Sequence, residues 1–177
     1  MGKLYFYYGT MGAAKSMELI LCQYRYENIG KRVLVLKSDK ATRDGELIKS
    51  RTGLYTTCHY LEPYLAKTSI DDIIKNYDII LIDEVQFCSE NTINKLADIT
   101  DKYDIPIICY GLKTDLRTHL FTGSKRLLEI ADKCVEIKNI CDCGNKALFS
   151  IKINGDDDIN GEYKACCRIC AKKYLKY

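Results

Sequence analysis

The stretch LYFYYGTMGAAKSMELI, residues 4–20, decides the fold. A short aromatic run ends at Gly9 and is typical of a buried strand, while apolar residues after Lys15 repeat at helical spacing. A strand, a glycine-containing turn and a helix in this order form the context of a phosphate-binding loop, G-x-x-x-x-G-K-S/T. Residues 9–16 match that pattern except at Ala14, where the pattern has glycine. The alternative interpretation is a solvated strand-to-helix turn with an incidental lysine.

Backbone N–H groups and the N-terminus of the following helix would surround the phosphates of a nucleotide at this loop. Lys15 would reach the β- and γ-phosphates of ATP, and the Ser16 hydroxyl would ligate Mg²⁺. If Ala14 takes left-handed dihedral angles, its side chain costs roughly 1–2 kcal/mol. The ATP-binding residues that we predict are Gly9, Thr10, Met11, Gly12, Ala13, Ala14, Lys15, Ser16 and Asp83.

A second motif supplies the acidic half of such a site. The apolar run IILIDE, residues 79–84, ends in two carboxylates. Asp83 stands where a Walker-B aspartate holds Mg²⁺ at the tip of a neighbouring strand. Because consecutive side chains of a strand point in different directions, Glu84 would face the group that attacks the γ-phosphate, as a general base. The alternative for Asp83 is a strand-end carboxylate in solvent.

Strand-like and helix-like runs alternate through most of the chain. We expect strands over residues 4–9, 32–38, 78–84, 106–112 and 133–139, helices over residues 15–30, 69–77, 90–103 and 124–132, and mostly loop over residues 39–68. Ser69 and Ser89 are the expected N-caps of two of these helices. Continuous apolar strands separated by helices indicate a parallel sheet that is covered on both faces.

The predicted fold class is therefore α/β, with a P-loop (RecA-like) parallel sheet flanked by helices and a small C-terminal zinc-binding domain. The βα alternation stops near Asn139, where a cysteine cluster begins. We therefore predict that residues 1–138 form a nucleotide-binding α/β domain and that residues 139–177 form a zinc-binding domain.

The composition describes a soluble globular protein, with 47% hydrophobic and 29% charged residues among 177. The formal net charge of +3 does not imply an extended nucleic-acid footprint. No apolar run approaches the ~20 residues needed to cross a bilayer and no secretory signal is evident, so we expect a cytoplasmic protein without membrane contact. Lys172, Lys173, Tyr174, Lys176 and Tyr177 form a basic end, which we interpret as a solvated face; a nucleic-acid contact is the alternative.

Half of the ten cysteines crowd the C-terminal end. Cys141-x-Cys143 and Cys167-x-x-Cys170 offer four thiolates on two turns, which is the usual ligand set of tetrahedral structural zinc. Cys166 competes with Cys167 as a ligand, but C-x-x-C is the commoner spacing. Free thiols or a small redox pair are the alternatives.

Together, these motifs resemble the type II thymidine kinases in their bacterial form. The stretches that carry the resemblance are YFYYGTMGAAKS, IILIDEVQF, PIICYGLKTDLR, LFTGSKRLLEIADKCVEIKNICDCGNKA and YKACCRICAKKY, in the family's order. The combination of all five is much more specific than any one of them. The function that the resemblance implies is ATP-dependent phosphorylation of the 5′-hydroxyl of thymidine or deoxyuridine.

The resemblance also implies roles for individual residues. Glu84 would be the catalytic base, and Ser16 and Asp83 would hold Mg²⁺. The nucleoside-binding residues implied are Gln86, Phe87, Arg117, Phe121 and Tyr163, and the zinc ligands are Cys141, Cys143, Cys167 and Cys170. A lasso-like loop before the last zinc cysteines would close over the nucleoside, and the protein would be a homotetramer. Phe87 and Phe121 have the alternative interpretation of plain core residues.

The chain departs from the family pattern at three places. Ala14 replaces a glycine, Ala41 stands before Thr42-Arg43 where the family has an acidic residue, and the stretch DDDINGEY keeps only Ile159 and Gly161 of an I-G-G pattern. An impaired or retuned kinase homologue that acts as a nucleotide-binding module is therefore one alternative function. A nucleic-acid-stimulated ATPase, in which an adjacent Asp–Glu pair is also common, is the other.

Overall fold

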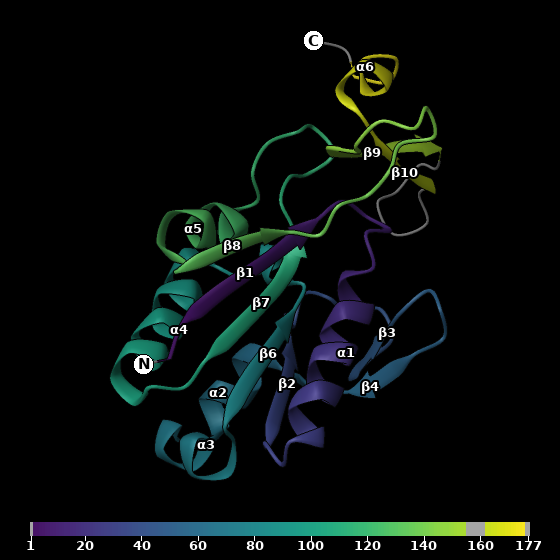
Figure 1. The fold of residues 1–177 in the computed structure, drawn as a ribbon. Coiled ribbons are helices and arrows are strands. Elements are labelled where there is room, and N and C mark those ends of the chain that lie inside the picture. The colour runs from purple at the N-terminus through teal and green to yellow at the C-terminus, as the bar shows by residue number, and fades with distance from the viewer. Residues whose placement is uncertain (1, 155–161, 176–177) are drawn as a thin grey trace.

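The centre of the fold is a six-stranded parallel sheet with the strand order β5-β2-β6-β7-β1-β8 (Figure 1). The computed structural model describes residues 2–154 and 162–175. Its elements in chain order are β1 (Leu4–Gly9), α1 (Lys15–Asn28), β2 (Val33–Lys37), β3 (Leu47–Lys49), β4 (Tyr55–Thr57), β5 (His59–Tyr60), α2 (Leu61–Lys67), α3 (Ile70–Asn76), β6 (Ile79–Asp83), the 3-10 turn η1 (Val85–Phe87), α4 (Glu90–Tyr103), β7 (Ile107–Leu112), α5 (Thr122–Ile130), β8 (Lys133–Glu136), β9 (Phe149–Asn154), β10 (Glu162–Cys166) and α6 (Arg168–Ala171). The predicted α/β class with a parallel sheet is confirmed.

Each face of this sheet is covered by its own hydrophobic cluster, because successive side chains of a strand point to opposite faces. In β6, Ile80 and Ile82 pack with residues of α2, α3, α4 and α5, whereas Ile79 and Leu81 pack with α1 and β3. Figure 1 shows α1 and the β3–β4 hairpin on one side of the sheet and α4 and α5 on the other. Burial on both faces explains why the strands are continuous apolar runs in the sequence.

Two helices begin at the serine residues that the sequence predicts as N-caps. The Ser69 and Ser89 hydroxyls accept hydrogen bonds from the N–H groups of Asp72 and Thr92, so both predicted N-caps are confirmed. After α1, Gly30 has a φ of 76°, which glycine adopts without strain. Within the described residues, no helix has the length and apolar character that crossing a bilayer requires.

Residues 39–68 are not mostly loop, so this expectation is wrong. They contain the β3–β4 hairpin, the edge strand β5 and helix α2. The two hairpin strands have three residues each, and Ile48 is their one buried residue. Strands this short and exposed show no alternating pattern. Helix α2 has Pro63 in its first turn, where the missing N–H costs no helical hydrogen bond.

The chain beyond β8 forms a small unit with its own sheet, which we call the cysteine lobe (residues 139–154 and 162–175). Its strands β9 and β10 pair antiparallel, and the sequence analysis expects neither of them. The lobe lies near the carboxyl ends of β1 and β7 (Figure 1). The division into two domains at residue 138 remains a prediction. The stretch 155–161, with the shortened loop around Ile159 and Gly161, lies outside the described residues.

Candidate functional site

One cleft of about 710 Å³ joins the phosphate loop and the acidic motif. Lys15 and Ser16 line it from the loop, and Glu84, Gln86 and Phe87 line it from the turn after β6. The two segments converge because β1 and β6 are parallel strands of one sheet with only β7 between them, so their carboxyl ends meet at one edge. Open α/β sheets bind ligands at this edge.

Lys15 is almost completely buried in the first turn of α1, with 9% of its surface exposed. Its Nζ donates to the carbonyl oxygen of Thr10 at 2.9 Å, across the loop. Burial lowers the pKa of Lys15, and the charges of Glu84 and Asp83 oppose this shift. Because an ammonium group has three donors, Lys15 can keep its carbonyl partner and still bind phosphate oxygens.

Ala14 adopts the left-handed conformation, with φ 62° and ψ 28°, at the N-cap of α1. Gly12, two residues earlier, has φ 76°. Ala14 therefore has the left-handed dihedral angles for which the sequence predicts a cost. Its Cβ sits where glycine alone is free of strain, at a cost of about 1–2 kcal/mol.

Ala14→Gly is expected to raise the free energy of unfolding by about 0.5–1 kcal/mol. Relief of the backbone strain exceeds the stability lost through the greater freedom of glycine in the unfolded chain. Urea unfolding measures the change. The matched control is Ala13→Gly, since Ala13 is buried and lies outside the left-handed region. This control should lose about 0.5–1 kcal/mol, and an equal loss in Ala14→Gly would contradict the strain.

Ser16 and Asp83 are paired behind the loop. The Ser16 hydroxyl donates to one Asp83 carboxylate oxygen at 3.0 Å, and the Glu84 N–H donates to the other at 3.0 Å. Asp83 is 3% exposed, and its pKa is raised by this burial and then by the charge of Glu84. A hydroxyl and a carboxylate are the hard oxygen ligands that Mg²⁺ prefers. The pair therefore fits this ion, whose charge would offset the burial of the carboxylate.

Glu84 leaves the strand in a left-handed conformation, with φ 56°. Its side chain lines the cleft, whereas the side chain of Asp83 stays buried. The Glu84 carboxylate accepts a hydrogen bond from the side-chain amide of Gln86. Gln86 Oε1 accepts in turn from the backbone N–H of Leu112 at 3.1 Å. Gln86 is 1% exposed. Its buried side-chain amide therefore connects the Glu84 carboxylate, the candidate base, to the backbone at the end of β7.

The turn η1, which carries Gln86 and Phe87, is packed against two glycines. A Cβ on Gly111 in β7 would lie 2.7 Å from Gln86 Oε1, and a Cβ on Gly123 in α5 would lie 2.2 Å from the carbonyl oxygen of Val85. Both distances are shorter than van der Waals contact. Glycine at these positions therefore lets β7 and α5 hold the turn from two sides.

Of the predicted nucleoside-binding residues, Phe87 and Phe121 are in direct contact. Phe87 and Phe121 form an edge-to-face pair, with ring centroids 5.7 Å apart and an interplanar angle of 78°. Both are half-buried, so neither is a plain core residue. Arg117 is exposed in the loop between β7 and α5, and Tyr163 is half-buried in β10. Of these four side chains, Phe87 is the one that lines the 710 Å³ cleft as described.

The β3–β4 hairpin adds positive charge to the cleft that the sequence analysis missed. Lys49 and Arg51 line the cleft, together with Arg43 and Asp44 from the preceding loop. Lys49 is paired with Asp44 at 3.5 Å. Arg43 and Arg51 form no ion pair with any residue that the structure describes. The sequence feature that could have indicated a role for Arg51 is the concentration of basic residues in the polar segment 39–52.

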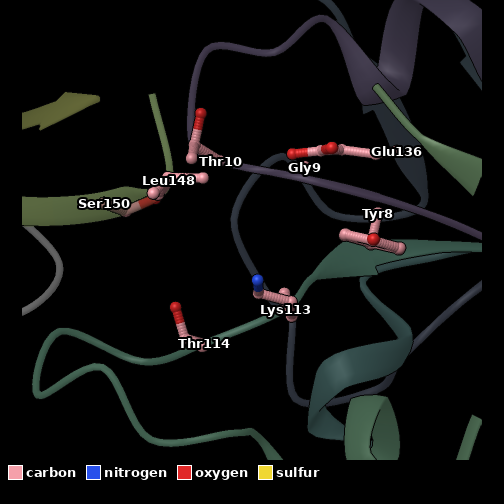
Figure 2. Close-up of a pocket in the computed structure, with 8 residues that line it drawn as sticks. All are labelled: Tyr8, Gly9, Thr10, Lys113, Thr114, Glu136, Leu148 and Ser150. Carbon is pink, nitrogen blue, oxygen red and sulfur yellow. The ribbon is translucent and has the colours of Figure 1, made fainter. Parts of the chain in front are cut away.

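The cysteine lobe is hydrogen-bonded to the phosphate loop. The Met11 N–H donates to Ser150 Oγ at 2.8 Å, and Asn139 Nδ2 donates to Thr10 Oγ1 and to the Met11 carbonyl oxygen, both at 3.1 Å. Figure 2 shows Thr10 and Ser150 at the edge of a small hollow that Lys113 also lines. Ser150 is 3% exposed, so this contact is shielded from water. Ser150 lies outside the five stretches that carry the resemblance, and Asn139 lies within one of them without an assigned role.

Four thiols of the lobe gather into one cluster. The Sγ atoms of Cys141, Cys143, Cys167 and Cys170 all lie within 4.8 Å of one another. Cys143 Sγ and Cys167 Sγ are 3.6 Å apart, close to the ~3.8 Å that separates two ligands on a tetrahedral zinc ion with bonds of about 2.3 Å. The cluster thus has the donors and the spacing of a structural zinc site.

Hydrogen bonds prepare two of these sulfur atoms for a metal ion. The N–H groups of Cys143 and Cys167 lower the pKa of Cys141, and the N–H and side-chain amide of Asn145, together with the Cys141 and Cys167 thiols, lower the pKa of Cys143 to about 6. These hydrogen bonds favour the thiolate, which is the form that binds metal. The pKa of Cys170 is instead raised to about 12 by hydrogen bonds with the other thiols. Cys166 is outside the cluster and packs with Ile151 in a separate apolar core.

The likeness to one solved structure, a replication initiator, is distant. The replication initiator DnaA bound to AMPPCP and single-stranded DNA has a TM-score of 0.49 and 23% sequence identity, over 77% of this chain and 40% of that chain. This chain therefore spans less than half of that protein. A likeness of this extent bears on no functional question.

Sequence comparison is far more specific. A family model described as thymidine kinase matches residues 2–171. The thymidine kinase of Zymomonas mobilis is 40% identical over 161 residues, which are 87% of this chain and 82% of that protein. The thymidine kinases of Photorhabdus laumondii and Blochmanniella pennsylvanica are 36% and 38% identical, each over 99% of this chain and over 94% and 92% of their own lengths. With such relatives along nearly its whole length, the chain belongs to the thymidine kinase family.

Proposed function

We propose that this protein transfers the γ-phosphoryl group of ATP to the 5′-hydroxyl of thymidine or deoxyuridine. The observation that carries the proposal is the shared cleft, which Lys15, Ser16 and Glu84 all line while Asp83 is bonded to Ser16 behind it. Phosphoryl transfer needs mainly positioning and neutralisation of charge, which these four side chains can supply.

Glu84 acts as the general base. Its carboxylate takes the proton of the 5′-hydroxyl as that oxygen attacks the γ-phosphorus. The new O–P bond forms while the bond from the γ-phosphorus to the β–γ bridging oxygen breaks, and ADP leaves with that electron pair. The hydrogen bond from Gln86 keeps the carboxylate in one orientation. Lys15 holds the β- and γ-phosphates through the transfer.

Mg²⁺ would be held by the Ser16 hydroxyl and the Asp83 carboxylate, which are already 3.0 Å apart. When bound, the ion neutralises charge on the β- and γ-phosphate oxygens. Its charge would also offset the cost of burying the Asp83 carboxylate.

The nucleoside lies at the Phe87 end of the cleft. Phe87 and Phe121 form a partly exposed aromatic pair, and a pyrimidine ring can pack against such a surface. Gln86 lies beside this pair. Tyr163, from β10, and Arg117, from the loop between β7 and α5, complete the pocket.

The cysteine cluster binds one structural zinc ion and so anchors both ends of the substrate loop. This role follows from the chemistry of its four thiols and from their spacing within 4.8 Å. We also propose that residues 1–138 and 139–177 act as a nucleotide-binding and a substrate-closing domain, and that the protein assembles into a homotetramer. Light scattering coupled to gel filtration tests the assembly.

The proposed reaction is tested with MgATP and thymidine, deoxyuridine or deoxycytidine in separate assays that quantify nucleoside monophosphate and ADP. We expect monophosphate from thymidine and deoxyuridine, with one ADP formed for each. ADP formation that single-stranded DNA stimulates and thymidine does not would instead identify an ATPase. Thermal stabilisation by thymidine and ATP without any monophosphate would identify a nucleotide-binding module.

A further inference from the structure

Arg51, on the turn between β3 and β4, reaches the phosphate loop from outside the sheet. Its Nη1 atom lies 3.7 Å from the place that a Cβ on Gly12 would occupy. Arg51 also lines the same cleft as Lys15, Ser16 and Glu84. Its guanidinium is therefore next to the loop that surrounds the phosphates, although nothing in the phosphate-loop or Asp–Glu motif includes it.

The turn that carries Arg51 is held in place by its own hydrogen bonds and by α1. The Ser50 N–H donates to the carbonyl oxygen of Leu54 at 2.8 Å, and the hydroxyls of Ser50 and Thr52 are 2.8 Å apart. The Thr52 hydroxyl also contacts the Met17 sulfur atom of α1 at 3.7 Å. Figure 1 shows the hairpin beside α1, the helix that begins at the phosphate loop.

The charge of Arg51 has no partner within the described part of the chain. Lys49 in the same hairpin is paired with Asp44, so the two cations differ. Burial lowers the pKa of Lys15, and the nearby charge of Arg51 lowers it further. Two cations that repel each other across an open cleft are stabilised by an anion that binds between them.

We propose that Arg51 binds the γ-phosphate of the nucleotide and stabilises the negative charge on its oxygens during transfer. This inference rests on the proposed function and adds a further catalytic residue to it. Since the Lys15 ammonium reaches the β- and γ-phosphates, a guanidinium close to that ammonium faces the same end of the triphosphate. The planar guanidinium can donate two parallel hydrogen bonds to phosphate oxygens.

Arg51 changes none of the bonds in the reaction. The 5′-oxygen still bonds to the γ-phosphorus, the bond to the β–γ bridging oxygen breaks, and Glu84 still takes the proton. The guanidinium stays protonated throughout. Its contribution is electrostatic, and it is largest when negative charge is spread over the three equatorial oxygens of the transferred group.

The test compares the wild type with Arg51→Ala, Arg51→Lys and Arg25→Ala in the full chain. Arg25→Ala is the charge-matched control, because Arg25 is exposed on α1 and paired with Glu18 at 2.9 Å, outside the cleft. Turnover with MgATP and thymidine gives kcat. Calorimetry gives the affinities for ADP and for a non-hydrolysable ATP analogue, and thermal unfolding checks that each variant is folded.

Arg51→Ala should lower kcat by about 100-fold or more. It should weaken binding of the ATP analogue by about tenfold and change ADP affinity by less than about threefold, since ADP lacks the γ-phosphate. Arg51→Lys keeps the charge but loses the planar fork, so kcat should fall by about tenfold. This variant also decides the question if the alanine variant is unstable. Arg25→Ala should match the wild type in all three measurements.

Two results would overturn the inference while leaving the proposed function intact: wild-type kcat in both Arg51 variants, or equal losses of affinity for the analogue and for ADP. If the wild type phosphorylates no nucleoside at all, the proposed function fails. Even then, the comparison of analogue with ADP decides whether Arg51 binds the γ-phosphate.

Discussion

Glu84→Gln is expected to lower kcat by about 10²–10⁴-fold, the usual contribution of a general base. The substitution removes the only proton acceptor that we assign to the 5′-hydroxyl, but it keeps the size and most of the packing of the side chain. Glu84 accepts from Gln86 and lies beside Lys15 without contributing to the sheet. Affinity for ATP and the unfolding temperature should therefore change little. Steady-state kinetics and calorimetric titration measure both properties.

Two further variants sharpen this result. Glu84→Asp keeps a carboxylate but withdraws it by one methylene, so kcat should lie between that of the wild type and that of Glu84→Gln. Glu90→Gln removes an exposed carboxylate in the first turn of α4 and should leave kcat unchanged. Retention of wild-type kcat in Glu84→Gln would show that another group, or water alone, takes the proton.

Cys167→Ala is expected to abolish metal binding, whereas Cys166→Ala keeps it. The two residues are adjacent, yet Cys167 belongs to the four-thiol cluster and Cys166 packs with Ile151 and Ala171. Structural zinc supplies much of the folding free energy of a small metal-binding unit, about 10–16 kcal/mol in zinc-finger peptides. Loss of one ligand should therefore unfold the cysteine lobe, while loss of the Cys166 side chain should cost about 1 kcal/mol.

Elemental analysis of the purified protein gives the zinc content, and hydrogen exchange locates the change. In Cys167→Ala, we expect protection to be lost from β9, β10 and α6 and retained in β6 and β7, which belong to the central sheet. The rate of thymidine phosphorylation should decrease because the cysteine lobe unfolds. Equal zinc content in the two variants would remove Cys167 from the ligand set.

The parallel sheet could be predicted because its strands are buried on both faces. IILID and IICYGL contain almost no polar residue, and such runs are typical of parallel strands. Serine caps at Ser69 and Ser89 located two helices. The convergence of Ser16 with Asp83 was predicted from the pairing of a phosphate loop with a Walker-B aspartate, and the structure explains it by the common edge at which the carboxyl ends of β1 and β6 meet.

The hairpin and its contribution to the cleft could not be predicted. Strands β3 and β4 are too short and too exposed to show a period, and Ile48 alone contacts the core. Arg51 meets Gly12 only because the hairpin folds back beside α1, which is a tertiary contact without a local signal. The role of Gln86 has the same origin, since its partner is the Leu112 N–H of another strand. The resemblance includes Gln86 as a nucleoside-binding residue, but its contact with a distant backbone group leaves no pattern in the sequence.

The hydrogen bond from Met11 to Ser150 joins a backbone amide of the phosphate loop to strand β9 of the cysteine lobe. On the proposed function, it lies between the part of the protein that binds ATP and the part that binds the nucleoside. A ligand that stabilises this hydrogen bond from one site lowers the free energy that is needed to order the other site for its own ligand. By reciprocity, ATP must change the affinity for thymidine by the same factor as thymidine changes the affinity for ATP. On the proposed function, this amide is therefore a direct structural link through which binding of donor and acceptor can be coupled.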